Sequence, residues 1–347
     1  MLVSMLVPLS MPIGSTASGQ KPLVVAWIYK VTPEVYRVVE ENHEYIGWLS
    51  PDWFVLKDNG TIGEFTERGA NDLNLINMAS EYGIQVHPMV VSNVPERMHQ
   101  LFTDPRAFNN FANALIELAK TYGYNGFNID FEAPMLEDAQ AFAQFLSMLA
   151  YRLHKAGLKL TVAVAAKRMD YSANSFLGAY DYKALGQSGV DYIMIMAYDY
   201  YELKGAPRPV APPDWVEACV RYALAHIPRE KLLLGIPSYG RERTTDGKHM
   251  DRHMYDYIAS LIKKQGLKPA FDETYKEKYL DLGSTVIYYN DQETVVYKAK
   301  IARKYDLPGV AVWRLDGGDP LIWPTIYKVL TQTTTTSTQT TTTTSTT

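Results

Sequence analysis

Short runs of β-branched and aromatic residues alternate with longer segments of helical periodicity along most of this chain. Segments with apolar residues at helical spacing fill most of the intervals, and several of them end at a glycine, as helix C-termini tend to. Alternation of this kind is typical of parallel sheets covered by helices. Eight runs predict an α/β protein with a closed (β/α)8 barrel rather than an open sheet. The runs lie at residues 23–29, 45–50, 84–92, 126–132, 158–167, 190–199, 231–240 and 309–316.

The order of these runs also predicts the domain organisation. All of them lie within residues 21–330, which we expect to form one barrel domain. Residues 243–285 are longer than a strand-to-helix connection of ~2 to 6 residues, so we expect a small insertion between the seventh and eighth strands. Residues 1–20 are apolar and then small, as in a secretory signal, although the usual early Lys or Arg is missing. Residues 331–347 are rich in Thr and predict a disordered, O-glycosylated tail, so we expect a secreted or cell-surface protein.

Composition and motifs exclude several classes of partner and cofactor. The net charge is −4 and no basic block is present, so neither nucleic acid nor a membrane surface is an expected partner. No Gly-rich phosphate motif follows any of the runs, so no nucleotide cofactor is expected. The single cysteine, Cys219, lies in a helical pattern and predicts a buried thiol. Asn59-Gly60-Thr61 fits both an N-glycosylation acceptor and a tight turn.

One pair of histidines has the spacing of a metal site. His249 and His253 are four positions apart, as two ligands on one helix face would be. No third ligand is evident near them, so we expect a solvated helix face and no metal. We expect the chain to act as a monomer.

The ends of the predicted strands carry the candidate chemistry, because active sites of such barrels lie at the C-terminal ends of the strands. The residues found there are acids, hydroxyls, cations and aromatic rings, which suit a sugar better than a phosphate. They are Tyr29, Ser92, Asn93, Glu132, Lys167, Arg168, Tyr198, Asp199, Tyr239, Arg241, Glu242, Trp313 and Asp316.

The run at residues 126–132 alternates polar and large apolar residues, so its two faces differ. A strand with one face in water is the common cause of such alternation, but the neighbouring runs are apolar on both faces, as buried parallel strands are. We therefore expect Asn128, Asp130 and Glu132 to line the barrel interior. Two buried carboxylates so close together do not both ionise easily. Glu132, nearest the barrel mouth, is the natural group to stay protonated and donate to a glycosidic oxygen.

Residues 125–132 resemble the signature strand D-G-x-D-x-D-x-E of glycoside hydrolase family 18, the chitinase family. The segments "MIMAYDYY" at 194–201, "LLGIPSYGRE" at 233–242 and "GVAVWRLDGGDP" at 309–320 resemble the motifs of the family's sixth, seventh and eighth strands. The four motifs occur in the family's order and are spread over most of the chain.

The resemblance implies a retaining, substrate-assisted hydrolase of β-1,4 linkages in polysaccharides that contain N-acetylglucosamine. Glu132 would protonate the leaving oxygen, Asp130 would accept the N–H of the substrate's acetamido group, and Tyr198 would hold the acetyl oxygen. The implied substrate-binding residues are Asn128, Met196, Asp199, Tyr239, Arg241, Trp313 and Tyr29.

Two positions depart from the family signature, because Asn125 and Asn128 stand where acids are usual. We therefore expect Asp130 to ionise more readily than in typical chitinases. The Asn-containing signature is most similar to the spore-cortex-lytic N-acetylglucosaminidase branch. Chitin, peptidoglycan and N-glycan cores all remain open as substrates. The alternative function is an inactive, lectin-like sugar-binding protein, but such members typically lack the acid, so the presence of Glu132 favours an enzyme.

Overall fold

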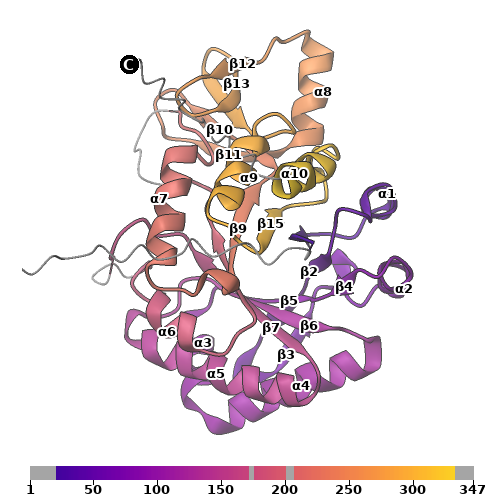
Figure 1. The fold of residues 1–347 in the computed structure, drawn as a ribbon, viewed down its shortest axis with the longest axis vertical. Coiled ribbons are helices and arrows are strands. Elements are labelled where there is room, and N and C mark those ends of the chain that lie inside the picture. Colours follow the sequence, from indigo (N-terminus) through magenta and orange to yellow (C-terminus); the bar gives the residue numbers. More distant parts are fainter. Residues whose placement is uncertain (1–20, 172–175, 201–206, 333–347) are drawn as a thin grey trace, which may run out of the picture.

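The computed structural model describes residues 21–171, 176–200 and 207–332. Within these residues eight parallel strands close into a barrel, since β1 pairs with both β2 and β15 (Figure 1). The predicted (β/α)8 barrel is confirmed. The predicted signal at 1–20 and the tail from residue 333 onward lie outside the described residues. Around the barrel the strands are β1 (Leu23–Ile28), β2 (Trp48–Leu56), β5 (Met89–Ser92), β6 (Gly126–Phe131), β7 (Lys159–Ala165), β8 (Tyr192–Met196), β9 (Leu232–Pro237) and β15 (Gly309–Trp313).

Helices cover the outside of the barrel. Four of them, α1, α3, α4 and α7, begin with a proline, whose missing N–H costs nothing at that position. Cys219 is buried on α7, as predicted. The helix α10 extends to Thr331, one residue into the segment that we expected to be tail. The helices are α1 (Pro33–Asn42), α2 (Leu73–Glu81), α3 (Pro95–Thr103), α4 (Pro105–Tyr122), α5 (Ala139–Lys155), α6 (Tyr182–Gln187), α7 (Pro213–Leu224), α9 (Val295–Lys304) and α10 (Ile322–Thr331).

The barrel has two hydrophobic cores. The larger core lies between the strands and the helices and includes Phe127, Ile129 and Phe131. The smaller core fills the barrel interior with alternate residues of the same strands, among them Trp27 and Met194. This division explains the alternation in β6, whose polar residues face inward and whose apolar residues face the helices.

Several strand boundaries differ from the predicted ones. β2 continues to Leu56 instead of ending at Ser50, because the barrel accommodates Pro51 and Asp52 inside the strand, next to a register shift against β5. Both residue types are rare in strands, so the sequence did not predict this second half of β2. The third predicted run is divided at Pro88 into the short strand β4 (Gln85–Val86) and β5. The short strand β3 (Ile62–Glu64) pairs antiparallel with β2. Before it, Asn59 and Gly60 both have positive φ, as in a tight turn.

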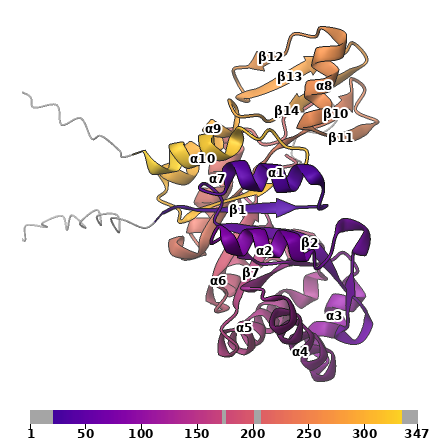
Figure 2. The same cartoon turned by 90° about the vertical axis from the view of Figure 1, so that its right-hand side faces the viewer.

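A second, antiparallel sheet lies between β9 and β15 in sequence. Figures 1 and 2 show this inserted unit at one end of the molecule, with α4 and α5 at the other. It begins at Tyr239, earlier than the predicted residue 243, because the predicted strand 231–240 is divided at Ser238. Its elements are β10 (Tyr239–Thr244), β11 (Met250–Met254), α8 (Tyr255–Gln265), β12 (Ala270–Asp272), β13 (Glu277–Asp281) and β14 (Thr285–Tyr289).

The predicted helix face with His249 and His253 is wrong. Residues 250–254 form the strand β11, which pairs with β10. The Nε2 atom of His253 lies 2.5 Å from a carboxylate oxygen of Glu242 on β10, and its ring stacks on Tyr257. Within the described residues no group of three or more His, Cys, Asp or Glu side chains could hold a metal ion. No helix in that part of the chain is long and apolar enough to cross a membrane.

Candidate active site

The inward face of β6 carries Asn128 and Asp130, with Glu132 directly after the end of the strand. Asn128 and Asp130 are buried, whereas Glu132 is exposed at the mouth of the barrel. The strand is held in place by its outward residues, which are fully buried in the outer core. The structure therefore brings the two acids together, and Glu132 is far more exposed to solvent than Asp130.

Asn128 is a satisfied residue of the barrel interior. Its Oδ1 atom accepts a hydrogen bond of 3.3 Å from the indole of Trp27, and its Nδ2 atom donates one of 2.7 Å to the hydroxyl of Thr161. Nδ2 also lies 3.7 Å from the sulfur of Met194. Asn128 lines neither of the two cavities described below, and its contact with substrate stays a prediction.

Asp130 is a buried acid without a full set of partners. Its Oδ1 atom is shielded from solvent and accepts no hydrogen bond within the described part of the chain. Burial raises the pKa of Asp130 well above its usual value, and the nearby carboxyls of Glu132 and Asp52 raise it further. The expectation that the neutral Asn128 lets Asp130 ionise more readily than in typical chitinases stays a prediction, because burial and the two neighbouring acids raise this pKa whatever residue stands at 128.

Two cavities meet at Glu132 and form a cleft across the barrel mouth. The first hollow has a volume of about 550 Å³ and lies toward β7 and β8, while the second hollow has about 440 Å³ and lies toward β2 and β5. Both are lined by Asp130, Glu132, Arg252 and Trp313. A proton donor at the junction of two cavities can act on a bond that joins two bound groups.

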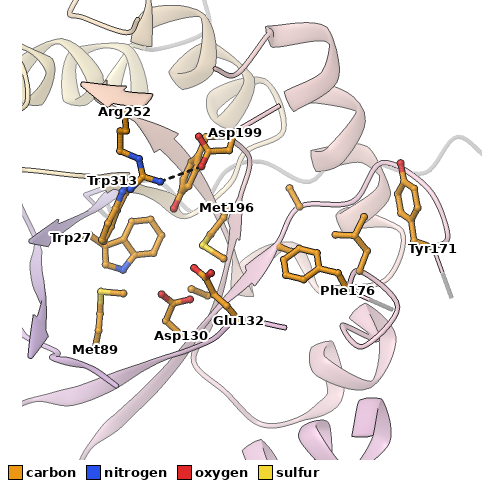
Figure 3. A pocket seen from close by; sticks show the side chains of 15 residues that line it. Trp27, Met89, Asp130, Glu132, Tyr171, Phe176, Met196, Asp199, Arg252 and Trp313 are labelled. Atoms are coloured by element: carbon orange, nitrogen blue, oxygen red, sulfur yellow. Dashed lines mark hydrogen bonds and ion pairs between the residues drawn. The ribbon is translucent and has the colours of Figure 1, made fainter. Parts of the chain in front are cut away.

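Glu132 has an environment that favours its protonated form. Loss of surrounding water raises the pKa of the Glu132 carboxyl. The positive charge of Arg252 opposes this rise, and the negative charge of Asp199 adds to it. Figure 3 shows Asp130 and Glu132 side by side below Trp27 and Met196, with Arg252 above them. The arrangement combines a deeply buried acid with a second acid that is open to the cleft.

The first hollow is mainly apolar and aromatic. Trp27 and Trp313 pack edge to face with their ring centres 6.2 Å apart, and Met196 lies beside them (Figure 3). Tyr198 lines the same hollow. Burial raises the pKa of Tyr198 well above its usual value, and Asp130 raises it further, so its hydroxyl remains a hydrogen-bond donor.

Asp199 is held by residues of the inserted unit. It accepts hydrogen bonds of 2.6 Å from the Tyr239 hydroxyl and of 2.8 and 2.5 Å from the Arg241 guanidinium. Arg252 approaches it to 3.4 Å. Burial alone would raise the pKa of Asp199, but these partners hold it below its usual value. Tyr239 and Arg241 line neither hollow and both contact Asp199, so their expected contact with substrate stays a prediction.

The second hollow is more polar than the first. Tyr29 lines it, with the guanidinium carbons of Arg68 and Arg314 at 4.3 and 4.7 Å from the centre of its ring. Arg68 forms a short ion pair with Asp52. Burial raises the pKa of Asp52 to about 6, although Arg68 opposes this rise.

Sequence reasoning missed Asp52, Arg68, Arg252 and Arg314. Asp52 was missed because β2 was predicted to end before it. The apolar run of residues 53–56 directly after it is the signal that could have extended the strand. Arg252 lies on β11 of the inserted sheet, and no local pattern tells where such a sheet meets the barrel. Arg314 follows Trp313 directly, but nothing in the sequence pairs it with Tyr29.

Comparison with known families gives this geometry a context. The sequence model described as "Glycosyl hydrolases family 18" matches residues 55–318, which is most of the chain. The chain belongs to glycosyl hydrolase family 18. It is therefore a glycosidase, and the resemblance seen in its strand motifs is confirmed.

Individual relatives within family 18 agree with this membership. The chain is 29% identical to the "Uncharacterized glycosylase YvbX" of Bacillus subtilis, over 84% of this chain and 87% of that protein. It is 24% identical to the "Cortical fragment-lytic enzyme" of Bacillus subtilis, over 85% of this chain and 70% of that one. A crystal structure of a chitinase from Chromobacterium violaceum superposes with a TM-score of 0.81 at 25% identity, covering 90% of this chain and all of that chain.

Proposed function

We propose that the protein is a retaining, substrate-assisted hydrolase of β-1,4-linked polysaccharides that contain N-acetylglucosamine. One observation carries the proposal: Glu132 stands at the junction of the two hollows, directly after β6, and the buried Asp130 lies two residues before it on that strand. An acid that is open to the cleft and has a raised pKa is suited to protonate a glycosidic oxygen.

The proposed reaction proceeds in two steps. Glu132 donates its proton to the leaving oxygen as the glycosidic bond breaks, and the acetamido oxygen of the substrate forms a bond to the anomeric carbon. The product of this step is a cyclic oxazolinium ion. Water then attacks the anomeric carbon, loses a proton to Glu132 and reopens the ring, so that the original configuration is restored.

The remaining residues of the first hollow support this reaction. Asp130 accepts the acetamido N–H and balances the charge of the oxazolinium ion. The hydroxyl of Tyr198 donates to the acetyl oxygen and orients it toward the anomeric carbon. Trp313 offers an aromatic face to the sugar, with Met196 beside it. Asp199, held by Tyr239 and Arg241, contacts the same sugar.

The proposed substrate is chitin or its oligosaccharides, with a peptidoglycan-type glycan as the second choice. The names of the relatives support both, since they include chitinases and cortical fragment-lytic enzymes. We further propose that the protein acts as a monomer in a secreted or cell-surface location, where such polymers occur.

The direct test offers the purified protein chitin oligosaccharides and peptidoglycan glycan strands. Product sizes and the anomer formed first are recorded by chromatography and NMR. We expect cleavage of at least one polymer, with the β anomer formed first. Glu132→Gln should lower kcat by about 10² to 10⁴, the usual contribution of a general acid. Glu137→Gln, which changes an exposed acid five residues further along the chain, serves as the control.

The outcomes separate the alternatives. Failure to cleave either polymer would contradict the proposal, and tight sugar binding without cleavage would support the lectin-like alternative. An α anomer as the first product would exclude the retaining mechanism.

A further inference from the structure

The hydrogen bonding between β6 and β7 ends before Glu132 is reached. The last residue pair in register is Ile129 with Val162. On the opposite side, β6 stays bonded to β5, and the Glu132 N–H donates to the Ser92 carbonyl at 2.8 Å. Adjacent residues of a strand direct their backbone groups to opposite sides. The Phe131 C=O and the Ala133 N–H therefore point toward the side where β7 no longer pairs.

The hydroxyl of Tyr180 takes the place of the missing strand partner. It donates a hydrogen bond of 2.9 Å to the Phe131 carbonyl and accepts one of 3.3 Å from the Ala133 N–H. Burial raises the pKa of Tyr180 far above its usual value, and Asp130 adds to the rise, so the phenol always has a proton to donate. These two hydrogen bonds bracket the backbone of Glu132.

Tyr180 itself is firmly fixed. Its side chain is fully buried, with Phe142 and Phe176 packed edge to face against its ring at centre distances of 6.4 and 6.2 Å. The ammonium group of Lys167 donates a short hydrogen bond to its backbone carbonyl. Because its side chain is locked by packing, the Tyr180 hydroxyl holds the strand end in one position instead of moving with it.

The conformation of Ala133 shows why the strand end needs such support. Ala133 has a φ of 56°, in the left-handed region, which is uncommon for a residue with a Cβ atom. The chain therefore turns sharply just after Glu132. The two hydrogen bonds of the buried Tyr180 hydroxyl, one donated and one accepted, oppose the tendency of this turn to relax.

We propose that Tyr180 is a positioning residue for Glu132, fixing the backbone on both sides of the acid so that its carboxyl lies where the two hollows meet. This inference rests on the proposed role of Glu132 in hydrolysis. A misplacement of about 1 Å at a reacting group can cost about 10²-fold in rate. Loss of the Tyr180 hydroxyl should therefore lower kcat more than it weakens substrate binding.

The test compares Tyr180→Phe with Tyr124→Phe. Tyr124 is a matched control, because it is also buried and its hydroxyl donates a hydrogen bond of 2.6 Å to Asn71, but it lies beyond the opposite end of β6. We expect Tyr180→Phe to lower kcat by about 10- to 100-fold with KM within about 2-fold. It should also shift the alkaline limb of the kcat profile, which the proton donor, Glu132, is expected to set. Tyr124→Phe should leave both constants and the pH profile unchanged.

A second measurement reports on the backbone directly. Amide hydrogen exchange at Ala133 should accelerate about 10-fold or more in Tyr180→Phe, and not in Tyr124→Phe, because only the first change removes its acceptor. If the native enzyme is active and Tyr180→Phe keeps its full kcat, only this inference is overturned. The same holds if the two variants lose kcat equally. A native protein without activity on any glycan would overturn the proposed function and, with it, the role of Tyr180 in that function.

Discussion

Two regions of this molecule bury acids, and they treat them differently. Glu277, on β13 of the inserted unit, is fully buried and accepts hydrogen bonds of 2.7 Å from the backbone N–H groups of both Val210 and Ala211. Lys298, also fully buried, lies 3.1 Å from the same carboxylate. Asp130 is buried in the barrel, where one carboxylate oxygen has no partner and the nearest charges are other acids.

The difference separates Glu277, an acid that supports the structure, from Asp130, an acid that we propose takes part in the reaction. Buried polar groups in native proteins are almost always hydrogen-bonded, so Glu277 follows the rule and Asp130 departs from it. Glu277 connects the inserted unit to α9 and to the segment after β8, which carries Asp199. Unpaired acids with raised pKa values cluster at functional sites. Each prediction below tests one side of this contrast.

The largest effect is expected at Glu277, the acid with a full set of partners. Glu277→Gln should lower the free energy of unfolding by about 3 to 5 kcal/mol, because it leaves the charge of Lys298 buried without a counter-charge. Urea denaturation at neutral pH measures the change. The double variant Glu277→Gln with Lys298→Met should recover part of the loss, since no charge then remains. A double variant that is no more stable than the single one would contradict the assigned importance of the ion pair.

The corresponding change at Asp130 should have the opposite effect on stability. Asp130→Asn removes a buried carboxyl that lacks a full set of partners, so the free energy of unfolding at neutral pH should stay the same or rise. The rate of glycan cleavage should fall by about 10²- to 10³-fold, because the group that balances the developing charge is lost. The same denaturation experiment and a kcat measurement test both halves. If Asp130→Asn destabilised the protein as strongly as Glu277→Gln, the contrast between the two regions would be lost.

The sequence predicted the barrel side of this contrast better than the inserted side. The alternation of residues 126–132 placed Asn128 and Asp130 in the barrel interior because a strand has a fixed period of two. Strand ends likewise located Tyr198 and Trp313 at the cleft. No such rule locates a side chain of a separate sheet.

Residues of the inserted unit were therefore misassigned or missed. Tyr239 and Arg241 were read as the end of a barrel strand, whereas they start the second sheet and contact Asp199. Arg252 reaches the cleft because β11 pairs with β10, the strand whose Tyr239 and Arg241 contact Asp199. Asp52 was not predicted as a cleft residue, because Pro51 and Asp52 are both rare in strands and β2 was therefore predicted to end before them.

Asp52 provides a prediction of intermediate size. A carboxyl whose pKa rises from 3.8 to about 6 on folding binds its proton more tightly in the folded state. Ionisation of Asp52 therefore lowers the free energy of unfolding as the pH rises from about 4 to about 6. Above this window the total loss corresponds to about 3 kcal/mol. Asp52→Asn should reduce the loss of stability between pH 4 and pH 7 by about that amount.

Denaturation curves at the two pH values measure this difference. Asp58→Asn is the control, because Asp58 also pairs with an arginine, Arg97 at 2.8 Å, but its side chain is 74% exposed. An equal change of pH dependence in the two variants would show that burial is not the cause.

The smallest effect is expected where the chain departs from the family signature. Asn128→Asp places a carboxyl beneath Asp130, among neutral groups that now satisfy the amide. A second negative charge there should raise the pKa of Asp130, and the acid limb of the kcat profile should move to higher pH by about 1 unit, which corresponds to about 1.4 kcal/mol. Asn125→Asp makes the same change at an exposed position of the signature, at the other end of β6, and should leave the profile in place. If Asn128→Asp also left the acid limb where it is, Asp130 would not be the group that sets it, and the acid limb would have to be assigned to another carboxyl of the cleft, such as Asp52.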